Sequence, residues 1–196
     1  RNRTRARGHC LVLRVAINGY GRIGRSILRA VYESEARGLL RIVAINEPAD
    51  ALTIAHLTRY DSTHGRFSGS VELQQGRLHI NGDAIDLFAG EQIENLPWGE
   101  LRVDVVLECS GAFSDRQTAE KHLRSGAGRV LFSQPAESDV DATVVFGVNH
   151  HHLDGTEQVI SSASCSTNAV VPVATVSGHE LPWQLASEAA PASEPS

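Results

Sequence analysis

Three glycines near the start of the chain have the spacing of a phosphate-binding turn. Gly19, Gly21 and Gly24 form the pattern G-x-G-x-x-G. In this pattern the first glycine permits a sharp turn, the second lets a pyrophosphate approach the backbone, and the third allows the following helix to pack closely on the preceding strand. The free N–H groups of that helix then face the phosphates. Glycine pairs also recur in ordinary turns, so the motif depends on its context.

A carboxylate stands at the distance where this pattern places its ribose-binding acid. Glu47 follows Gly24 by 23 positions, and in dinucleotide-binding folds an acid about 20 residues past the glycines accepts hydrogen bonds from the adenosine ribose. A carboxylate there also repels a 2′-phosphate, so the sequence favours NAD over NADP. The alternative is a solvated loop acid that binds nothing.

A second candidate for chemistry is a cysteine late in the chain. Cys165 follows an apolar run and a turn rich in serine. If a helix begins near Cys165, its dipole and free amides favour the reactive thiolate. The same amides would stabilise an oxyanion formed by attack on a carbonyl. A buried, inert thiol is the equally weighted alternative.

Alternating strands and helices are expected to position these groups. Leu11–Ile17 and Leu39–Ile45 are apolar runs typical of buried parallel strands. Between them, a stripe with helical periodicity predicts a helix packed on the sheet, and it consists of Ile23, Ile27, Ala30 and Val31. The fold class is therefore α/β, with a doubly wound, Rossmann-type, mostly parallel sheet.

Later segments continue this pattern. Helices are predicted over Ala49–Thr58 and over Ser114–Ser125, with Ser114 as the N-cap of the second. Further strands are predicted at Val103–Cys109, Val130–Phe132 and Ala142–Phe146. An inserted β-hairpin is predicted from Val71–Leu73 and Leu78–Ile80, with another turn at Asn81-Gly82. The polar segment Tyr60–Phe67 is interpreted as a loop, because no nucleophile lies near it in sequence.

Small residues follow two of the predicted strands. Ser110 and Gly111 come after the strand ending at Cys109, and Ser133 comes after Phe132. Ligands bind at the carboxyl edge of doubly wound sheets, so these three residues are candidate cofactor contacts. Any loop between strand and helix has a similar composition.

The composition excludes several classes of protein. The net charge of −5 gives no general reason to expect a nucleic-acid partner, and no apolar run approaches the roughly 18 residues that cross a bilayer. Cys10, Cys109 and Cys165 are widely spaced without C-x-x-C, which argues against disulfides and a metal site. We therefore expect a soluble, cytoplasmic protein.

The two ends differ in composition from the middle of the chain. Residues 1–13 form an arginine-rich extension that runs into the first strand. We interpret the extension as unstructured, and the alternatives are an arm that binds nucleic acid and a targeting peptide. Residues 177–196 form a low-complexity tail. Between them we expect an NAD-binding domain at 14–164 and the start of a cysteine-bearing helix at 165–176.

Four motifs in a fixed order point to a known family. They are I-N-G-Y-G-R-I-G-R at Ile17–Arg25, Y-D-S-T-H-G-R-F at Tyr60–Phe67, G-V-N at Gly147–Asn149 and A-S-C-S-T-N at Ala163–Asn168. By these motifs the chain resembles the glyceraldehyde-3-phosphate dehydrogenase superfamily over about residues 14–176. The runs at 44–47 and 131–145 look more like the branch of that superfamily that oxidises D-erythrose 4-phosphate.

The resemblance implies an activity and a set of site residues. Cys165 matches the family nucleophile, Arg22 and Ile23 match NAD contacts, and Ser164, Ser166 and Thr167 match substrate contacts. The implied reaction oxidises a phosphorylated aldose through a cysteine thiohemiacetal and thioester to 4-phosphoerythronate. Members of the family are cytoplasmic homotetramers, and this branch feeds pyridoxal phosphate synthesis.

The chain also departs from the family pattern. Nothing after Val176 matches the catalytic domain that supplies the activating histidine and the phosphate-binding arginines, and Gly90-Glu91 stand where a basic residue commonly lies near the adenine. We therefore expect a truncated chain that binds NAD with little turnover. The alternatives are a glyceraldehyde-3-phosphate dehydrogenase and a non-catalytic NAD-binding module.

Overall fold

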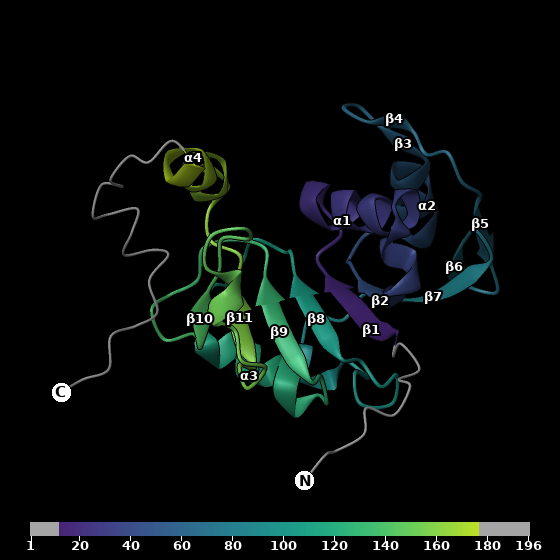
Figure 1. Cartoon of the computed structure of the whole chain (residues 1–196). Helices are drawn as coiled ribbons and strands as arrows, with labels where there is room; N and C mark the ends of the chain where they lie inside the picture. Colours follow the sequence, from purple (N-terminus) through teal and green to yellow (C-terminus); the bar gives the residue numbers. More distant parts are fainter. Residues whose placement is uncertain (1–11, 177–196) are drawn as a thin grey trace, which may run out of the picture.

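The computed structural model describes residues 12–176, which are built around one twisted sheet (Figure 1). Nine strands lie in the order β10-β11-β9-β8-β1-β2-β7-β6-β5. The parallel strands are β1 (Leu13–Asn18), β2 (Leu40–Asn46), β7 (Asp83–Phe88), β8 (Val105–Glu108), β9 (Arg129–Phe132), β10 (Ala142–Thr143) and β11 (Val159–Ser161). The predicted doubly wound, mostly parallel sheet is confirmed.

The strand order reverses between β1 and β8. From β1 the chain moves through β2 to β7 on one side, and it then returns to β8 on the other side of β1. Asn18, the last residue of β1, is in register with both Asn46 of β2 and Glu108 of β8. In doubly wound sheets, ligands bind in the crevice at such a reversal, beyond the carboxyl ends of the strands.

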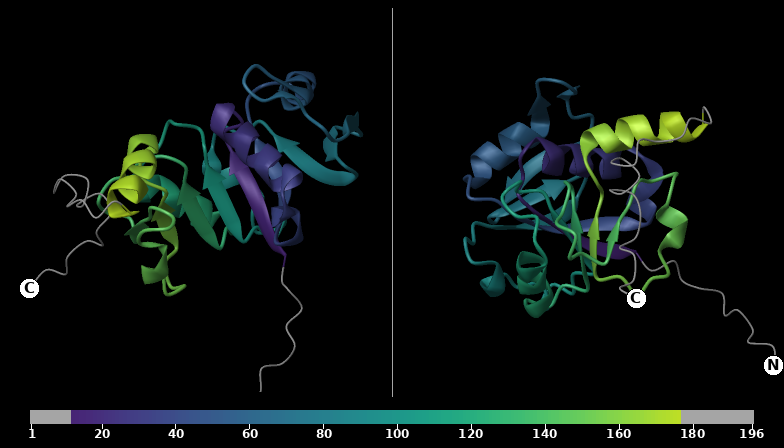
Figure 2. Two further views of the ribbon diagram at one scale, coloured as in Figure 1. Left: turned by 45° about the horizontal axis from the view of Figure 1, so that its top comes forward. Right: turned by 90° about the vertical axis from the view of Figure 1, so that its left-hand side faces the viewer.

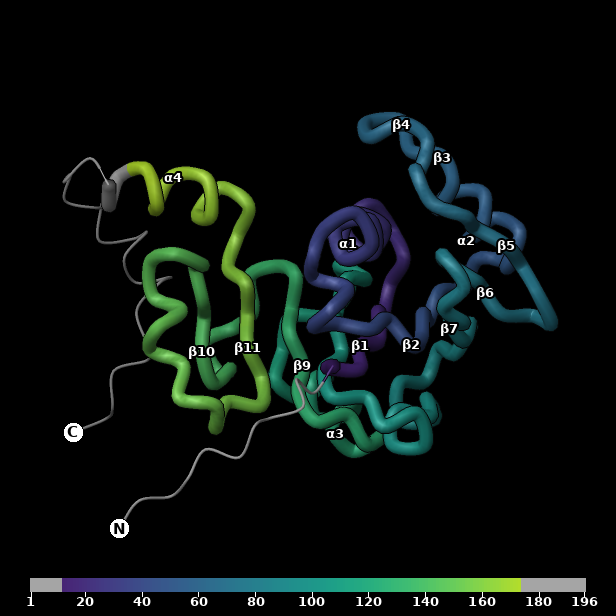
Figure 3. Tube along the Cα trace, turned by 45° about the vertical axis from the view of Figure 1, so that its right-hand side comes forward, coloured from purple at the N-terminus to yellow at the C-terminus, as the bar shows by residue number. Residues whose placement is uncertain are grey.

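Helices cover both faces of the sheet. Helices α1 (Arg22–Glu33) and α2 (Ala51–Arg59) lie on one face and α3 (Arg116–Arg124) on the other (Figure 3). The residues of β1 alternate accordingly, since Val15 and Ile17 belong to the core cluster with Leu28 of α1, whereas Ala16 packs in a second cluster with Trp98. Short 3-10 turns lie at η1 (Glu35–Gly38), η2 (Ile93–Asn95) and η3 (His150–His152).

The buried face of α1 is rotated from the one predicted. Ile23 is half exposed and Ala30 is exposed, whereas Gly24, Leu28 and Val31 are buried at positions i, i+4 and i+7. The glycine turn causes this rotation, because Gly24 must face the backbone of the turn. The prediction of a helix is confirmed, and two of the four predicted stripe residues, Ile27 and Val31, pack against the core, whereas the prediction was wrong for Ile23 and Ala30.

The antiparallel part of the sheet includes the predicted hairpin. Strands β5 (Val71–Gln74) and β6 (Arg77–Ile80) pair with each other, and β6 pairs in turn with the first half of β7. The second half of β7 pairs parallel to β2. The sequence analysis predicted the turn at Asn81-Gly82 but not the strand that follows it. Tyr60–Asp61 (β3) and Gly65–Arg66 (β4) form a separate two-stranded ribbon within the segment interpreted as a loop.

Two local predictions were wrong. Strand β10 ends at Thr143 rather than at Phe146, because the side chain of Asn149 accepts a hydrogen bond from Val145 N–H and donates one to Thr143 O, which turns the chain. The N-cap of α3 is Asp115 rather than Ser114, since its carboxylate accepts a hydrogen bond from Thr118 N–H at 2.8 Å.

Helix α4 (Cys165–Val176) lies apart from the other helices. It follows β11 and stands at the opposite end of the molecule from β3 and β4 (Figure 2). Pro172 lies inside the helix, and Val171 is buried while Val170 and Val173 are exposed. Within residues 12–176, no helix is long and apolar enough to span a membrane.

Candidate functional site

The three glycines of the turn between β1 and α1 differ in what a Cβ at each position would meet. Gly19 has φ +88°, and a Cβ on it would lie 2.4 Å from the backbone of Ser110. A Cβ on Gly24 would lie 2.4 Å from Gly19 O. A Cβ on Gly21, in contrast, would meet no described atom within 4 Å. Gly19 and Gly24 are therefore required by packing, whereas Gly21 borders open space in which a pyrophosphate fits.

The start of α1 is available to an anion. Gly21 is the N-cap residue and forms no side-chain capping hydrogen bond with the helix. The first turn, which includes Arg22 and Ile23, contains no acidic residue. The partial positive charge of the helix terminus therefore faces the open space beside Gly21 with no acidic residue in the first turn of the helix.

A cavity of about 450 Å³ opens at this turn. It is lined by Asn18, Gly19, Gly21, Asn46, Glu47, Pro48, Gly90, Glu91, Ile93, Cys109, Ser110 and Phe113. Four predicted cofactor residues are among these, namely Gly19, Gly21, Glu47 and Ser110. The other five lie outside the lining, namely Arg22, Ile23, Gly24, Gly111 and Ser133. The cavity thus lies where the strand order reverses, and its size suits part of a dinucleotide.

Glu47 connects the end of β2 to the glycine turn. One of its carboxylate oxygens accepts a hydrogen bond from Tyr20 N–H at 2.7 Å, and the other is 3.5 Å from Ala49 N. Glu47 is half-buried and lines the cavity. It therefore orders the turn and still presents carboxylate oxygen to the cavity, where ribose hydroxyls would be its donors.

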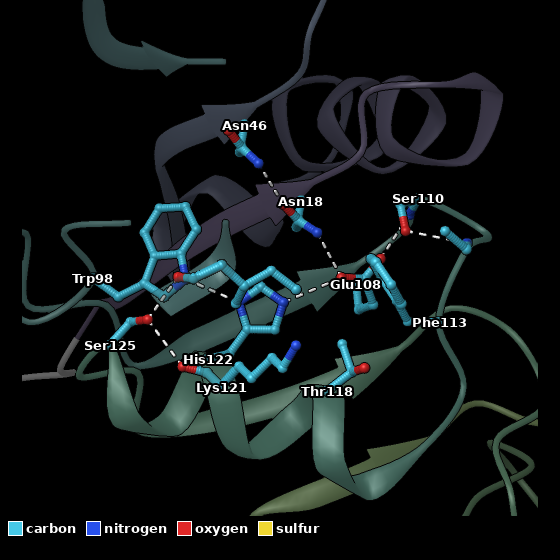
Figure 4. Close-up of polar contacts among 12 residues, drawn as sticks. Asn18, Asn46, Trp98, Glu108, Ser110, Phe113, Thr118, Lys121, His122 and Ser125 are labelled. Carbon is cyan, nitrogen blue, oxygen red and sulfur yellow. Dashed lines mark hydrogen bonds and ion pairs between the residues drawn. The ribbon is translucent and has the colours of Figure 1, made fainter. Parts of the chain in front are cut away.

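A row of buried, hydrogen-bonded side chains begins at Asn18 and Asn46, which line the cavity (Figure 4). Asn46 donates from Nδ2 to Asn18 Oδ1 at 2.7 Å, and Asn18 donates from Nδ2 to Glu108 Oε2 at 2.6 Å. Asn46 also pairs with Gly90, accepting from its N–H at 2.8 Å and donating to its oxygen at 3.0 Å. These contacts join the ends of β1, β2 and β8 with the loop at Gly90.

The row continues through α3 to a buried indole. His122 Nε2 lies 3.1 Å from Glu108 Oε2, and Trp98 donates from Nε1 to His122 Nδ1 at 3.0 Å. Because Nδ1 accepts this bond, the proton of the imidazole is assigned to Nε2, which donates to Glu108. Glu108, His122 and Trp98 are all fully buried. The carboxylate is thus the common acceptor of two hydrogen-bonded chains.

The charge of Glu108 is maintained by its donors. Burial raises the pKa of Glu108, but the hydrogen bonds from His122, Ser110 and Asn18 lower it by more, so the net shift is downward. Glu108 Oε1 accepts a bond from Ser110 N–H at 2.8 Å. The residue therefore remains a carboxylate at neutral pH although no water reaches it.

The thiol of Cys109 lies in the same cavity but in an unreactive state. Burial raises its pKa to about 11, although a hydrogen bond with Ser133 lowers this pKa in part, and the charge of Glu108 raises it slightly further. Since the thiolate is the nucleophile, Cys109 is an inert part of the wall at neutral pH. Ser133, a predicted cofactor residue, acts here as the neighbour of this thiol.

Cys165 begins the helix that the sequence predicted. It is exposed and is the first residue of α4. Figure 1 shows that α4 follows β11 at the carboxyl edge of the sheet. Ala163, two residues earlier, has φ +58°, a left-handed conformation unusual for alanine. The backbone therefore turns sharply before the thiol. Cys165 itself is not among the residues that line the cavity.

The hydroxyl groups around Cys165 form a cap for α4. Ser164 Oγ accepts a hydrogen bond from Thr167 N–H at 3.0 Å and lies 2.6 Å from Thr167 Oγ1 and 3.0 Å from Ser166 Oγ. Ser166 is exposed, Ser164 is half-buried and Thr167 is fully buried. Ser164 and Ser166 are thus accessible for substrate contacts, while the side chain of Thr167 is packed inside the protein.

The sequence analysis did not identify the buried row as part of the site. Its members are Asn18, Asn46, Trp98, Glu108 and His122. One signal was present, since the strands end in the same sequence, Ala16-Ile17-Asn18 and Ala44-Ile45-Asn46. An amide at the carboxyl end of two apolar strands indicates paired side chains at the ligand-binding edge. Trp98 and His122 have no such signal.

A comparison with protein families agrees with this geometry. The model of the family "Glyceraldehyde 3-phosphate dehydrogenase, NAD binding domain" matches residues 13–116, somewhat more than half of the chain. The matched range contains the glycine turn, Glu47, Glu108 and Ser110, and it includes every residue that lines the cavity. The open space at Gly21 and the uncapped start of α1 fit the pyrophosphate of NAD. The chain therefore belongs to the glyceraldehyde 3-phosphate dehydrogenase family and carries its NAD-binding domain.

Proposed function

We propose that the protein takes part in the NAD-dependent oxidation of a phosphorylated aldehyde, D-erythrose 4-phosphate, with Cys165 as the nucleophile. The observation that carries this proposal is the placement of two features at one edge of one sheet. The cavity of the NAD-binding domain and the thiol at the start of α4 both follow the carboxyl ends of the parallel strands.

The residues that would hold NAD divide into three groups by their chemistry. The turn at Gly19 and Gly21 and the first amides of α1 suit the pyrophosphate. Glu47 suits the hydroxyls of the adenosine ribose, and Ser110 borders the cavity from β8. When bound, NAD supplies an acceptor for the hydride that leaves the substrate carbon.

Cys165 would provide the covalent step. Its thiolate sulfur adds to the aldehyde carbon, the carbon–oxygen double bond opens, and the resulting oxyanion takes up a proton to give a thiohemiacetal. Loss of the hydroxyl proton and of a hydride from that carbon leaves a thioester, which water cleaves to the carboxylic acid and the free thiol. Amides at the start of α4 suit the oxyanion, and Ser164 and Ser166 lie beside it.

The chain on its own is expected to bind NAD with little turnover. Within residues 12–176, no hydrogen bond or ion pair reaches the Cys165 thiol, so no described side chain acts as its base. A nucleophile without a base lacks activation. We also propose that the active form is a homo-oligomer, which sedimentation at several concentrations would test.

Two measurements test this function. Calorimetric titration of the purified chain with NAD should show saturable binding at one site. NADH formation from erythrose 4-phosphate should be slow and should disappear in Cys165→Ala, whereas NAD binding should be unchanged in that variant. Turnover that survives Cys165→Ala would refute the role of the thiol, and a chain that fails to bind NAD would refute the function as a whole.

A second substrate is favoured by the family description itself, which names glyceraldehyde 3-phosphate. The two aldehydes differ by one hydroxymethylene unit and present the same reacting group. Single-turnover NADH formation with each aldehyde, with and without inorganic phosphate, separates them. Faster reaction with glyceraldehyde 3-phosphate and a requirement for phosphate would favour this second candidate.

A further inference from the structure

We propose that Glu108, His122 and Trp98 form a positioning device for the cofactor. In this device Glu108 fixes the two adjoining loops, at Gly19 and at Ser110, that line the NAD cavity, and Trp98 orients His122 so that its proton points at Glu108. The inference rests on the family's NAD site and concerns how that site is held in shape. None of these three side chains needs to touch the cofactor.

Glu108 makes two connections, one to each of the two loops. Its Oε1 accepts from Ser110 N–H at 2.8 Å, and its Oε2 accepts from Asn18 Nδ2 at 2.6 Å. Asn18 directly precedes Gly19, and both Gly19 and Ser110 line the cavity. One buried carboxylate therefore determines the position of the glycine turn and of the loop after β8 at the same time.

If these two loops moved apart, the shape of the ligand-binding cavity would change. A Cβ on Gly19 would lie 2.4 Å from the Ser110 backbone, so the loops are in close contact. The turn that presents its amides to the pyrophosphate is thus held from below by Glu108. A shift of Glu108 would move both walls of the cavity together.

The hydrogen bonds of His122 have a defined direction. Trp98 Nε1–H donates to His122 Nδ1, which leaves the proton on Nε2 for Glu108 (Figure 4). The indole is a donor only, so it cannot support the other tautomer. His122 is held in turn by α3, where the nearby Ser125 Oγ donates to Ile93 O at 2.7 Å. Ile93 lines the far side of the cavity, so α3 braces the cavity at two points.

This arrangement has an energetic cost. Burying a carboxylate, an imidazole and two amides is unfavourable compared with apolar side chains of similar volume, even when all are paired. A role in packing alone would be met as well by leucine. Orienting a backbone amide, in contrast, requires a directional hydrogen bond, which leucine cannot form.

The test compares two substitutions of His122. In His122→Gln the side-chain amide retains an N–H donor near the position of Nε2, whereas in His122→Leu a similar volume has no donor. We expect Kd for NAD to rise by about tenfold in His122→Leu and by no more than about threefold in His122→Gln, because one hydrogen bond to a buried charge is at stake. Lys121→Gln, on the same helix but paired with Glu94, is the control and should leave Kd unchanged.

Thermal midpoints separate the positioning role from a packing role. If His122 only fills space, His122→Leu should have a thermal midpoint equal to or higher than that of His122→Gln, and it should bind NAD at least as tightly. This result would overturn the proposal. Wild-type protein that binds no NAD would instead refute the cofactor assignment on which the proposal rests. NAD binding that is equal in all variants would refute the proposal alone.

A measurement on the unmodified chain keeps the proposal testable if the variants do not fold. In heteronuclear proton–nitrogen NMR spectra, we expect His122 to show the Nε2–H tautomer. Saturation with NAD should shift the resonance of the Trp98 indole N–H together with that of the Ser110 amide. Trp183→Phe leaves Trp98 as the single indole and assigns its signal. The opposite tautomer, or a Ser110 shift without any change at Trp98, would contradict the device.

Discussion

The Glu47 carboxylate accepts a hydrogen bond from the Tyr20 N–H at 2.7 Å, so the end of the second strand is fixed against the glycine turn after the first. This contact gives Glu47 a structural task in addition to any contact with ribose. It also places a carboxylate in the lining of the cavity. Glu91 adds a second carboxylate to the lining of the same cavity.

The charge of Glu47 is expected to determine the preference between NAD and NADP. In Glu47→Gln the amide oxygen still accepts from Tyr20 N–H, so the turn is retained while the charge is removed. We expect the ratio of the NADP and NAD dissociation constants to fall by about fivefold, which corresponds to about 1 kcal/mol for a partly exposed charge. Calorimetry with both nucleotides measures this ratio. Glu72→Gln, on exposed β5, is the control, and an unchanged ratio in Glu47→Gln would show that the charge does not discriminate.

Gly24 is expected to tolerate no side chain. In Gly24→Ala the new methyl group would meet Gly19 O, so α1 or the turn must shift. We expect a loss of about 1 to 3 kcal/mol in the free energy of unfolding, as is typical of overpacking. NAD affinity should fall as well.

Urea denaturation measures the effect of this substitution. Gly38→Ala is the matched control, because a Cβ there meets no described atom within 4 Å. Equal stability of the two variants would show that the contact between helix and turn is not tight.

The two described cysteines should differ in reactivity. Iodoacetamide at neutral pH should label exposed Cys165, whereas Cys109 should resist, because its pKa is raised to about 11 and its thiol is buried. Peptide mass mapping distinguishes the sites, and it separates both from Cys10, which lies outside the described residues. Labelling of Cys109 should appear only in urea. Cys109 reacting as fast as Cys165 in the native protein would contradict the closed cavity wall.

Glu108 should make the protein sensitive to acid. Its folded-state pKa lies below the ordinary 4.5, so its contribution to stability is complete above 4.5 and is lost as the pH falls through the lower, folded-state value. Glu108→Gln should remove this part of the pH dependence. At neutral pH the variant should be less stable by about 3 to 5 kcal/mol, because an NH2 group replaces one carboxylate oxygen and leaves buried donors facing a donor.

Unfolding free energies of both proteins between about pH 6 and about pH 3 test this prediction. Asp115 and Asp141 also have lowered pKa values, so the difference between the two curves is the relevant quantity. Parallel curves would contradict the prediction, because they would show that folding leaves the pKa of Glu108 unchanged.

Local patterns were sufficient for the fold and for the glycine turn. The apolar run before Gly19, the helical periodicity after it and the hairpin around Gly76 each depend on neighbours in sequence. Strand β7 escaped prediction because its two halves have different partners. It pairs antiparallel with β6 up to Ile85 and parallel with β2 from Asp86, so no single local pattern describes it.

The floor of the site depends on contacts that no local pattern contains. Asn18 and Glu108 are 90 positions apart, and His122 is 24 positions from Trp98. Each residue alone is typical of a strand end or an exposed helix. Only the tertiary arrangement shows that burial turns them into one hydrogen-bonded row, and the repeated asparagine after β1 and β2 was the one visible trace of it.

The helix that carries Cys165 has a practical consequence for work with this chain. Val170 and Val173 are exposed on α4, and Phe146 on the preceding loop is 79% exposed. Exposed apolar side chains promote nonspecific association as the protein concentration rises. Concentrated solutions are therefore expected to aggregate and to increase the fluorescence of hydrophobic dyes. Slow labelling of Cys165 in such samples would result from aggregation and not from a low reactivity of the thiol.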